Sequence, residues 1–231
     1  LLSISVHYYT INALNNKRAF KVVKTSAKFN TIQGFDLWGR PLKSKNAIKK
    51  AEGRSNRVKR KSTYGVELNA TQYYKNFYGN ISESYLQTLV KKARNSRQPL
   101  EQYILSTLEH RFDVLLYRIG FVSTPLEGRQ LIKHGHFKIN GQKSDIPSII
   151  LNKGDLIETC PEAKSILMEK MFSNITKNRS LSCPPEHVEV CYKTLKAIVL
   201  SGCNTRNAIH YVSPEFKEFY DFKWVLQRYN R

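Results

Sequence analysis

Residues 108–158 read LEHRFDVLLYRIGFVSTPLEGRQLIKHGHFKINGQKSDIPSIILNKGDLIE, and this stretch decides the fold. Its first part predicts a helix that ends at Gly120, a usual position for a C-terminal glycine. Apolar residues at helical spacing form one face of it: Leu108, Phe112, Leu115, Leu116 and Ile119. Pro125 suits the first position of a second helix, which the preceding serine or threonine caps and Gly135 ends.

Short strands are predicted to follow these helices. Residues 136–139 alternate between polar and apolar side chains as a half-buried strand does. Asn140-Gly141 then favours a two-residue hairpin turn, and Lys153-Gly154-Asp155 favours another turn before the apolar pair at 156–157. The stretch therefore predicts an α+β unit in which two short helices pack on a short antiparallel sheet.

Basic side chains recur on the polar stripes of both predicted helices. Arg111 and Arg118 are seven residues apart, and Arg129 and Lys133 are four apart, so each pair shares one helix face. We expect both of these faces to be exposed. The outer helical surface of the unit is thus predicted to be basic.

Four motifs in this stretch, in this order, resemble the RNA-binding module named after the fourth small-subunit ribosomal protein. They are Arg111-Phe112-Asp113, Tyr117-Arg118-Ile119-Gly120, the run GRQLIKHG at 128–135 and Asn140-Gly141. The same module occurs in tyrosyl-tRNA synthetases, pseudouridine synthases and a heat-shock protein. Two departures are visible, because Gly128 stands where the family usually has alanine and Pro125 replaces a residue that is often basic. Gly128 is expected to weaken its helix by about 0.5–1 kcal/mol relative to alanine.

The preceding residues 60–79, RKSTYGVELNATQYYKNFYG, resemble the segment before the module in the ribosomal members of the family. The synthetases, pseudouridine synthases and heat-shock protein lack that segment, so the chain resembles the ribosomal protein itself. The resemblance implies a structural component that binds the 5′ domain of small-subunit rRNA early in assembly. It also implies neighbouring small-subunit ribosomal proteins as partners, and a place near the path along which mRNA enters.

The resemblance also implies which side chains of the module bind RNA. We expect the four basic helix residues to contact phosphates rather than bases, because they would lie against a folded RNA. Two histidines flank a glycine on the side that the resemblance assigns to RNA, where a polar surface role is favoured over acid–base chemistry. The predicted RNA-binding residues of the module are Arg111, Arg118, Arg129, Lys133, His134, His136 and Lys138.

Charge supports a polyanionic partner independently of the resemblance. The 231 residues carry a formal net charge of +20, and residues 1–62 hold fifteen basic residues against two acids. A globular enzyme rarely needs such an excess, whereas neutralising phosphates releases counterions and favours binding. A generally basic, soluble surface is the alternative. A membrane surface is a weaker reading, because the sequence has no apolar run of eighteen residues and no lipidation motif.

The segment 38–62 holds ten basic residues, one acid and little to bury, so we expect an arm that becomes ordered only against RNA. Trp38 adds a stacking group to this charge. The alternatives are a solvated linker or a targeting signal. The arm's predicted RNA-binding residues are Arg40, Lys43, Lys45, Lys49, Lys50, Arg54, Arg57, Lys59, Arg60 and Lys61.

The remaining periodicity predicts helices at 67–77, 82–95 and 99–119, and a last helix at 214–229. Four parts follow from these elements. A basic, largely extended arm spans 1–62, and a helical domain spans 63–107 and is completed by residues 213–231. The RNA-binding module spans 108–158. Residues 159–212 are interpreted as a lineage-specific insertion of unknown role, within which 163–172 is predicted to be helical and 188–200 is apolar enough to fold.

Catalysis and cofactors are not predicted. The sequence has no phosphate loop, dinucleotide glycine pattern, nucleophile elbow or HExxH helix. The cysteines Cys160, Cys183, Cys191 and Cys203 form no Cys-x-x-Cys pair, so free thiols are favoured over a zinc site, and no metal or other cofactor is expected. A pseudouridine-synthase-like enzyme and a stand-alone RNA chaperone are the competing functions, since either could use the same module.

Composition also points to a compartment. The chain is rich in Asn, Ile, Lys, Phe and Tyr, whose codons are A/T-rich, as in mitochondrial genomes. The long segment after 158 suits the mitochondrial branch as well. We therefore predict a place in the small subunit of the ribosome of the mitochondrial matrix, with a plastid as the alternative.

Overall fold

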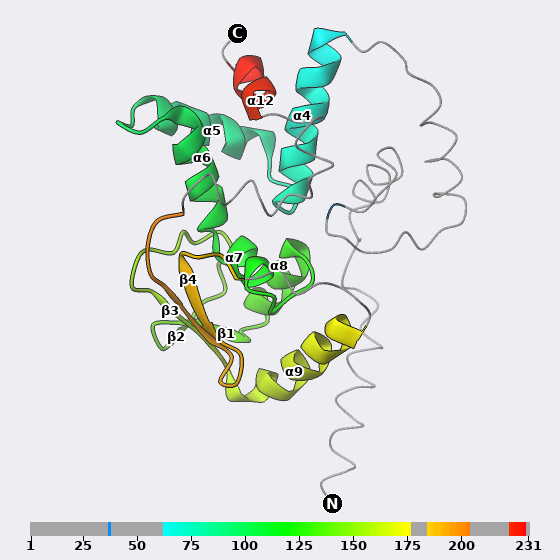
Figure 1. The fold of residues 1–231 in the computed structure, drawn as a ribbon, viewed down its shortest axis with the longest axis vertical. Helices are drawn as coiled ribbons and strands as arrows, with labels where there is room; N and C mark the ends of the chain where they lie inside the picture. Colours follow the sequence, from blue (N-terminus) through cyan, green and yellow to red (C-terminus); the bar gives the residue numbers. More distant parts are fainter. Residues whose placement is uncertain (1–36, 38–61, 177–183, 204–221, 230–231) are drawn as a thin grey trace, which may run out of the picture. The chain divides into compact units, whose positions relative to one another are not determined.

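The computed structural model describes residues 37, 62–176, 184–203 and 222–229 (Figure 1). Every helix and strand described below lies within the unit Lys59–Arg231. The predicted basic arm therefore lies outside the described residues, apart from Leu37 and Ser62.

Three helices build the helical domain: α4 (Thr63–Phe77), α5 (Glu83–Arg94) and α6 (Leu100–Glu109). The predictions of helices at 67–77 and 82–95 are confirmed. Each begins after a serine, because the hydroxyls of Ser62 and Ser82 accept the backbone N–H groups of Gly65 and Tyr85. These caps explain why α4 starts earlier than its apolar spacing indicates.

The C-terminal helix α12 (Phe222–Tyr229) packs on α4, as predicted for the return of the chain end. Phe222 is buried, and its ring meets that of Tyr74 edge to face at a centroid distance of 5.0 Å. At the other end of α12, the carbonyl oxygen of Tyr229 accepts a hydrogen bond from Arg94 of α5. The predicted residues 214–221 of this helix lie outside the described part of the chain.

The single helix predicted at 99–119 is wrong, because the chain breaks at His110 and Arg111 into α6 and α7 (Phe112–Arg118). The loop at 147–151 causes the break by binding the backbone there. Leu151 N–H donates to His110 O, and the N–H groups of Phe112 and Asp113 donate to the carbonyls at 149 and 147. These bonds hold Arg111 in an extended conformation, so tertiary pairing overrides a helical apolar pattern.

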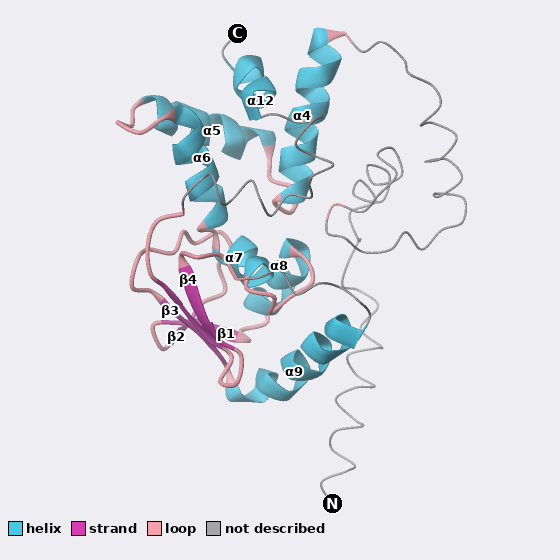
Figure 2. Cartoon of the chain, in the orientation of Figure 1, coloured by secondary structure: helices cyan, strands magenta, loops and turns pink. Residues whose placement is uncertain are grey.

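The module follows as predicted, with α7 and α8 (Pro125–Lys133) packed on an antiparallel sheet (Figure 2). Thr124 is the cap of α8, since its hydroxyl accepts the N–H of Glu127. The two helices approach closely at Gly128, where a Cβ would lie 3.1 Å from the carbonyl oxygen of Asp113. Glycine there thus offsets its poor helix propensity by allowing this contact. The α+β class is confirmed.

Within the described residues the sheet has five strands in the order β2-β1-β3-β5-β4, all antiparallel to their neighbours. Three of them were expected from the module stretch, and two come from the segment after it. Their bounds are β1 (Phe137–Ile139), β2 (Gln142–Lys143), β3 (Leu156–Thr159), β4 (Val188–Cys191) and β5 (Lys196–Val199).

The described parts of 159–212 are built into the module's core. The helix predicted at 163–172 is confirmed as α9 (Pro161–Thr176), and 188–200 forms the β4–β5 hairpin. One hydrophobic cluster holds Phe112, Leu115 and Phe137 together with residues from this segment: Ala163, Leu167, Met171, Val188, Leu195, Ala197 and Val199. The interpretation of the segment as lineage-specific stays a prediction, but what is described of it completes the module.

The hairpin turn supplies a first test of this fold. Asn140 and Gly141 have φ values of 51° and 80°, which confirms a turn with both central residues left-handed, as type I′ requires. We expect Gly141→Val to lower the free energy of unfolding by about 1–2 kcal/mol, because a β-branched residue resists positive φ. Urea unfolding measures this. Gly202→Val is the control, since its Cβ would also meet open space but its φ is not left-handed; equal destabilisation of both variants would contradict the turn's role.

Candidate nucleic-acid interface

A basic surface lies where α8 ends and β1 begins. Lys133 and His134 are exposed, and His136 and Lys138 are half-buried. The rings of His134 and His136 stack nearly parallel, with centroids 6.0 Å apart and planes 13° from each other. The structure therefore brings together four of the seven predicted RNA-binding residues of the module.

A further lysine, Lys143, belongs to this surface, although the sequence analysis did not predict it as an RNA-binding residue. Lys143 of β2 is exposed and is the cross-strand partner of Lys138. Directly opposed residues share one face of a sheet, and like charges there repel each other. The signal was available, because a two-residue turn at 140–141 necessarily pairs 138 with 143.

The row of paired residues continues across the sheet. Lys138 is opposite Glu158 of β3, and Glu158 is opposite Lys196 of β5, with 2.5 Å between Lys196 Nζ and Glu158 Oε1. The hydrogen bond from Lys196, and then the charges of both lysines, lower the pKa of the Glu158 carboxyl. One acid therefore faces three lysines in this row, and the open face of the sheet stays positive. We call Lys133, His134, His136, Lys138 and Lys143 the basic face.

The prediction that Arg118 is exposed is wrong. Its side chain is 3% exposed, and its guanidinium donates two hydrogen bonds to Glu109, from Nε to Oε2 at 2.7 Å and from Nη2 to Oε1 at 2.6 Å. Burial opposes the charge of Arg118, but the charge and hydrogen bonds of Glu109 outweigh it and raise the pKa of Arg118. The guanidinium also lies 5.2 Å from the centroid of the Phe77 ring.

Arg111 is also buried, against the prediction. Its Nε and Nη2 donate to the two carboxylate oxygens of Asp113 at 3.1 and 3.0 Å, and Asp113 is fully buried. The charge of Arg111 also lies 5.3 Å from the centroid of the Tyr85 ring. Helical spacing placed Arg111 and Arg118 on one stripe, but spacing alone does not reveal that the helical domain and the acids Glu109 and Asp113 cover that stripe.

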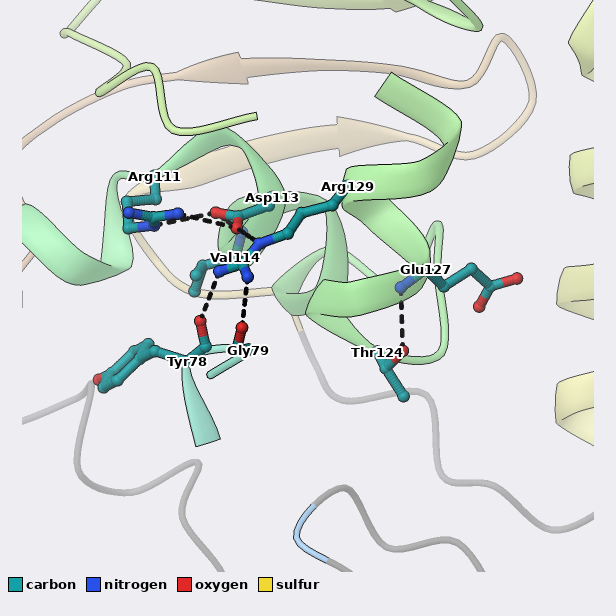
Figure 3. Close-up of polar contacts among 8 residues, drawn as sticks. All are labelled: Tyr78, Gly79, Arg111, Asp113, Val114, Thr124, Glu127 and Arg129. Carbon is teal, nitrogen blue, oxygen red and sulfur yellow. Dashed lines mark hydrogen bonds and ion pairs between the residues drawn. The ribbon is translucent and has the colours of Figure 1, made fainter. Parts of the chain in front are cut away.

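Arg129 is neither buried, as Arg111 and Arg118 are, nor fully exposed; its side chain is 23% exposed (Figure 3). From α8 it reaches Asp113, with 2.5 Å between Nε and Oδ2. Its Nη1 donates to the carbonyl oxygen of Gly79, and its Nη2 donates to that of Tyr78 at 3.0 Å. All three guanidinium nitrogens thus have acceptors inside the protein.

Tyr78 contacts both the Arg118–Glu109 pair and Arg129, which binds Asp113. Its hydroxyl donates to Glu109 Oε1 at 2.7 Å, and burial, followed by the negative charge of Glu109, raises the pKa of Tyr78 well above its ordinary value. Two buried carboxylates, Glu109 and Asp113, therefore fix three arginines and the turn after α4. We call these six residues, Tyr78, Glu109, Arg111, Asp113, Arg118 and Arg129, the ion-pair network.

The predicted residues of the arm, from Arg40 to Lys61, lie outside the described residues. Within the described part, Cys160, Cys191 and Cys203 are free cysteines, and no three His, Cys, Asp or Glu side chains are grouped to hold a metal. None of the helices described there is long and apolar enough to span a membrane.

Fold and surface together define an RNA-binding module of a ribosomal type attached to a helical domain. The family model described as "S4 domain" matches residues 111–157, and the one described as "Ribosomal protein S4/S9 N-terminal domain" matches residues 17–109. The two matches abut at the break between α6 and α7.

Curated relatives extend the similarity over most of the chain. A "Small ribosomal subunit protein uS4" of Parvibaculum lavamentivorans is 33% identical over 172 residues, which cover 74% of this chain and 82% of the relative. Proteins of the same name from Sulfurihydrogenibium sp. and Granulibacter bethesdensis are 33% identical over 169 and 178 residues, covering 80% and 85% of those relatives. This chain belongs to the ribosomal protein uS4 family.

The buried pair of Arg118 and Glu109 makes a stability prediction. Arg118→Met should lower the free energy of unfolding by about 3–5 kcal/mol, because it leaves Glu109 charged and buried with only the Tyr78 hydroxyl. Thermal and urea unfolding of purified protein measure the change. Arg97→Met, at an exposed arginine, is the control and should change stability by no more than about 0.5 kcal/mol. A small effect at Arg118 would mean that the network is not closed in solution.

His187 predicts how stability depends on pH. It is 6% exposed, its ring lies 5.3 Å from that of His110, and its Nε2 has no hydrogen-bond partner. Burial, then the charges of His110 and Arg118, lower the pKa of His187 from 6.5 to about 4, although Glu109 acts in the opposite direction. The native state therefore binds fewer protons than the unfolded state between these values.

Stability should consequently be full above pH 6.5 and fall as the pH drops toward 4, by up to about 1.4 kcal/mol per pH unit from this residue. Unfolding free energies measured from pH 8 to pH 4.5 give the slope. His187→Phe should flatten that slope while keeping an aromatic ring at this position. A variant with the parent's slope would show that another group titrates there.

Proposed function

We propose that the chain is a structural constituent of a small ribosomal subunit, in which it binds small-subunit rRNA. The observation that carries this proposal is the basic face on a module of the uS4 family. Lys138 and Lys143 are directly opposed on it, and the single acid Glu158 beside Lys138 offsets only part of the lysine charge in this row, so an anion bound over the face is favourable. A phosphate backbone is the anion that such a surface fits, and phosphate contacts orient a protein on its RNA without reading sequence.

The chain is not an enzyme, since the relatives that define its family bear the name of a ribosomal protein. Among the described residues, α9, β4 and β5 contribute to the module's own core.

The finer assignments are proposals that rest on the family. We propose that the 5′ domain of the small-subunit rRNA is the binding site, that neighbouring ribosomal proteins and incoming mRNA lie nearby, and that the subunit is mitochondrial. The richness of the chain in Asn, Ile, Lys, Phe and Tyr, whose codons are A/T-rich, supports the last of these. Mass spectrometry of small subunits purified from mitochondria and from the cytosol tests it, and presence only in the cytosolic particle would refute it.

Within the RNA surface, we propose the basic face together with the arm residues from Arg40 to Lys61. Arg111 and Arg118 are left out, because both are buried and paired with carboxylates. His134 and His136 offer a stacked pair of rings, and aromatic rings of this kind can stack on unpaired bases.

Salt dependence tests the basic face. Substituting Lys133, Lys138 and Lys143 by alanine should lower the slope of log affinity against log salt by about 0.7–0.9 for each phosphate that the protein no longer neutralises. The measurement is filter binding of the full chain to a transcript of the small-subunit rRNA 5′ domain. A matched variant removes three exposed lysines elsewhere, Lys153, Lys193 and Lys223. If both variants lower the slope equally, the basic face is not a distinct site.

A further inference from the structure

The turn after α4 is held from two sides by the ion-pair network. Its backbone carbonyls, at Tyr78 and Gly79, accept hydrogen bonds from Arg129 of α8, and the Tyr78 hydroxyl binds Glu109 at the end of α6. The helical domain is joined to the module by the chain at His110 and Arg111 and by the pairing of Arg118 of α7 with Glu109 of α6, and this turn joins it to α8 as well. A single covalent connection would allow the two parts to pivot, and the contacts of Arg129 at the turn oppose that motion.

Arg129 suits the contact with the turn at Tyr78 and Gly79 because its guanidinium is a planar fork. Its nitrogens reach a carboxylate of α7 and two carbonyls of the helical domain at once. A lysine has one nitrogen and could not match this pattern. Asp113 does not depend on Arg129 alone, because Arg111 binds both of its carboxylate oxygens.

We propose that Arg129 is a positioning residue rather than an RNA contact. It fixes the turn at Tyr78 and Gly79 against the module. The basic residues of the helical domain and those of the module therefore stay at a constant distance and can bind the same RNA molecule. On the helical domain these are Lys91, Lys92 and Arg97, and on the module they are Lys133, Lys138 and Lys143. The proposal rests on the RNA-binding function proposed above.

Gly79 shows how closely the connection is built. Its φ is +80°, and a Cβ placed on it would lie 3.0 Å from Arg129 Nη2, 3.1 Å from Arg129 Cζ and 3.2 Å from Pro125 Cβ. A methyl group here would push the guanidinium off both carbonyls. Gly154, whose φ is +92°, has open space around the same position. Alanine at either glycine strains the backbone, but only alanine at Gly79 would displace Arg129, so comparing the two variants distinguishes these effects.

The first experiment compares Arg129→Met with Lys133→Met, each of which removes one positive charge from the same helix. Binding of the full chain to the rRNA 5′-domain transcript is measured from low to high salt, after unfolding curves confirm that each variant is folded. Arg129→Met should weaken binding on the order of 10-fold and keep the parent's salt slope, because rigid linkage raises the effective concentration of the second surface but releases no counterion. Lys133→Met should lower the slope by about 0.7–0.9.

A slope that falls equally in both variants would make Arg129 a phosphate contact and overturn the proposal, as would unchanged affinity in Arg129→Met. If instead Lys133→Met keeps the parent's slope while Arg129→Met weakens binding, the basic face is wrongly assigned and the positioning role stands. A parent chain that does not bind the transcript would refute the proposed function itself.

The second experiment leaves Arg129 in place. Gly79→Ala should weaken RNA binding to the same extent as Arg129→Met, again with the parent's salt slope, whereas Gly154→Ala should bind as the parent does. Arg129→Met combined with Gly79→Ala should be no weaker than either single variant, because both break one connection. Equal affinities for Gly79→Ala and Gly154→Ala, or effects that multiply in the double variant, would overturn the proposal.

Discussion

Two buried carboxylates hold the described part of this protein together. Asp113 and Glu109 are fully or nearly fully buried, and a charge in such a place is strongly unfavourable unless it is paired and hydrogen-bonded. Each carboxylate meets a bidentate arginine, and each also reaches a further group, Arg129 for Asp113 and Tyr78 for Glu109. Because these partners come from α4, α6, α7 and α8, satisfying the two charges fixes how those helices are arranged. Apolar packing alone would tolerate more than one arrangement.

The motifs that carried the family resemblance describe this interior more than the RNA surface. Arg111, Asp113 and Arg118 lie in the ion-pair network, and Gly128 allows α7 and α8 to approach each other. Arginines in the motifs of an RNA-binding protein are easily interpreted as phosphate contacts. Here arginine's several donors and weaker hydration make it suited to buried pairing, whereas the strongly hydrated lysines remain on the surface.

The sequence predicted those parts of the fold that local chemistry determines. The threonine cap and the proline at the start of α8 and the Asn140-Gly141 turn each act through neighbouring residues, and each was placed correctly. The break at His110 was not predictable in this way, because it is caused by backbone bonds to residues almost forty positions later. Burial of Arg111 and Arg118 was missed for a related reason. Periodicity identifies which residues share a face, but only the tertiary structure decides what covers that face.

Strand register, more than residue type, determines which lysines lie together on the open face of the sheet. The core requires Phe137 and Ile157 to point inward, which forces Lys138 and Glu158 to the opposite face of the sheet. The two-residue turn then sets Lys143 beside Lys138, and the β4–β5 hairpin sets Lys196 beside Glu158. The positive row is thus a consequence of the same pattern that builds the core. Because a one-residue shift in register would bury these lysines, a folded module necessarily presents them on its open face.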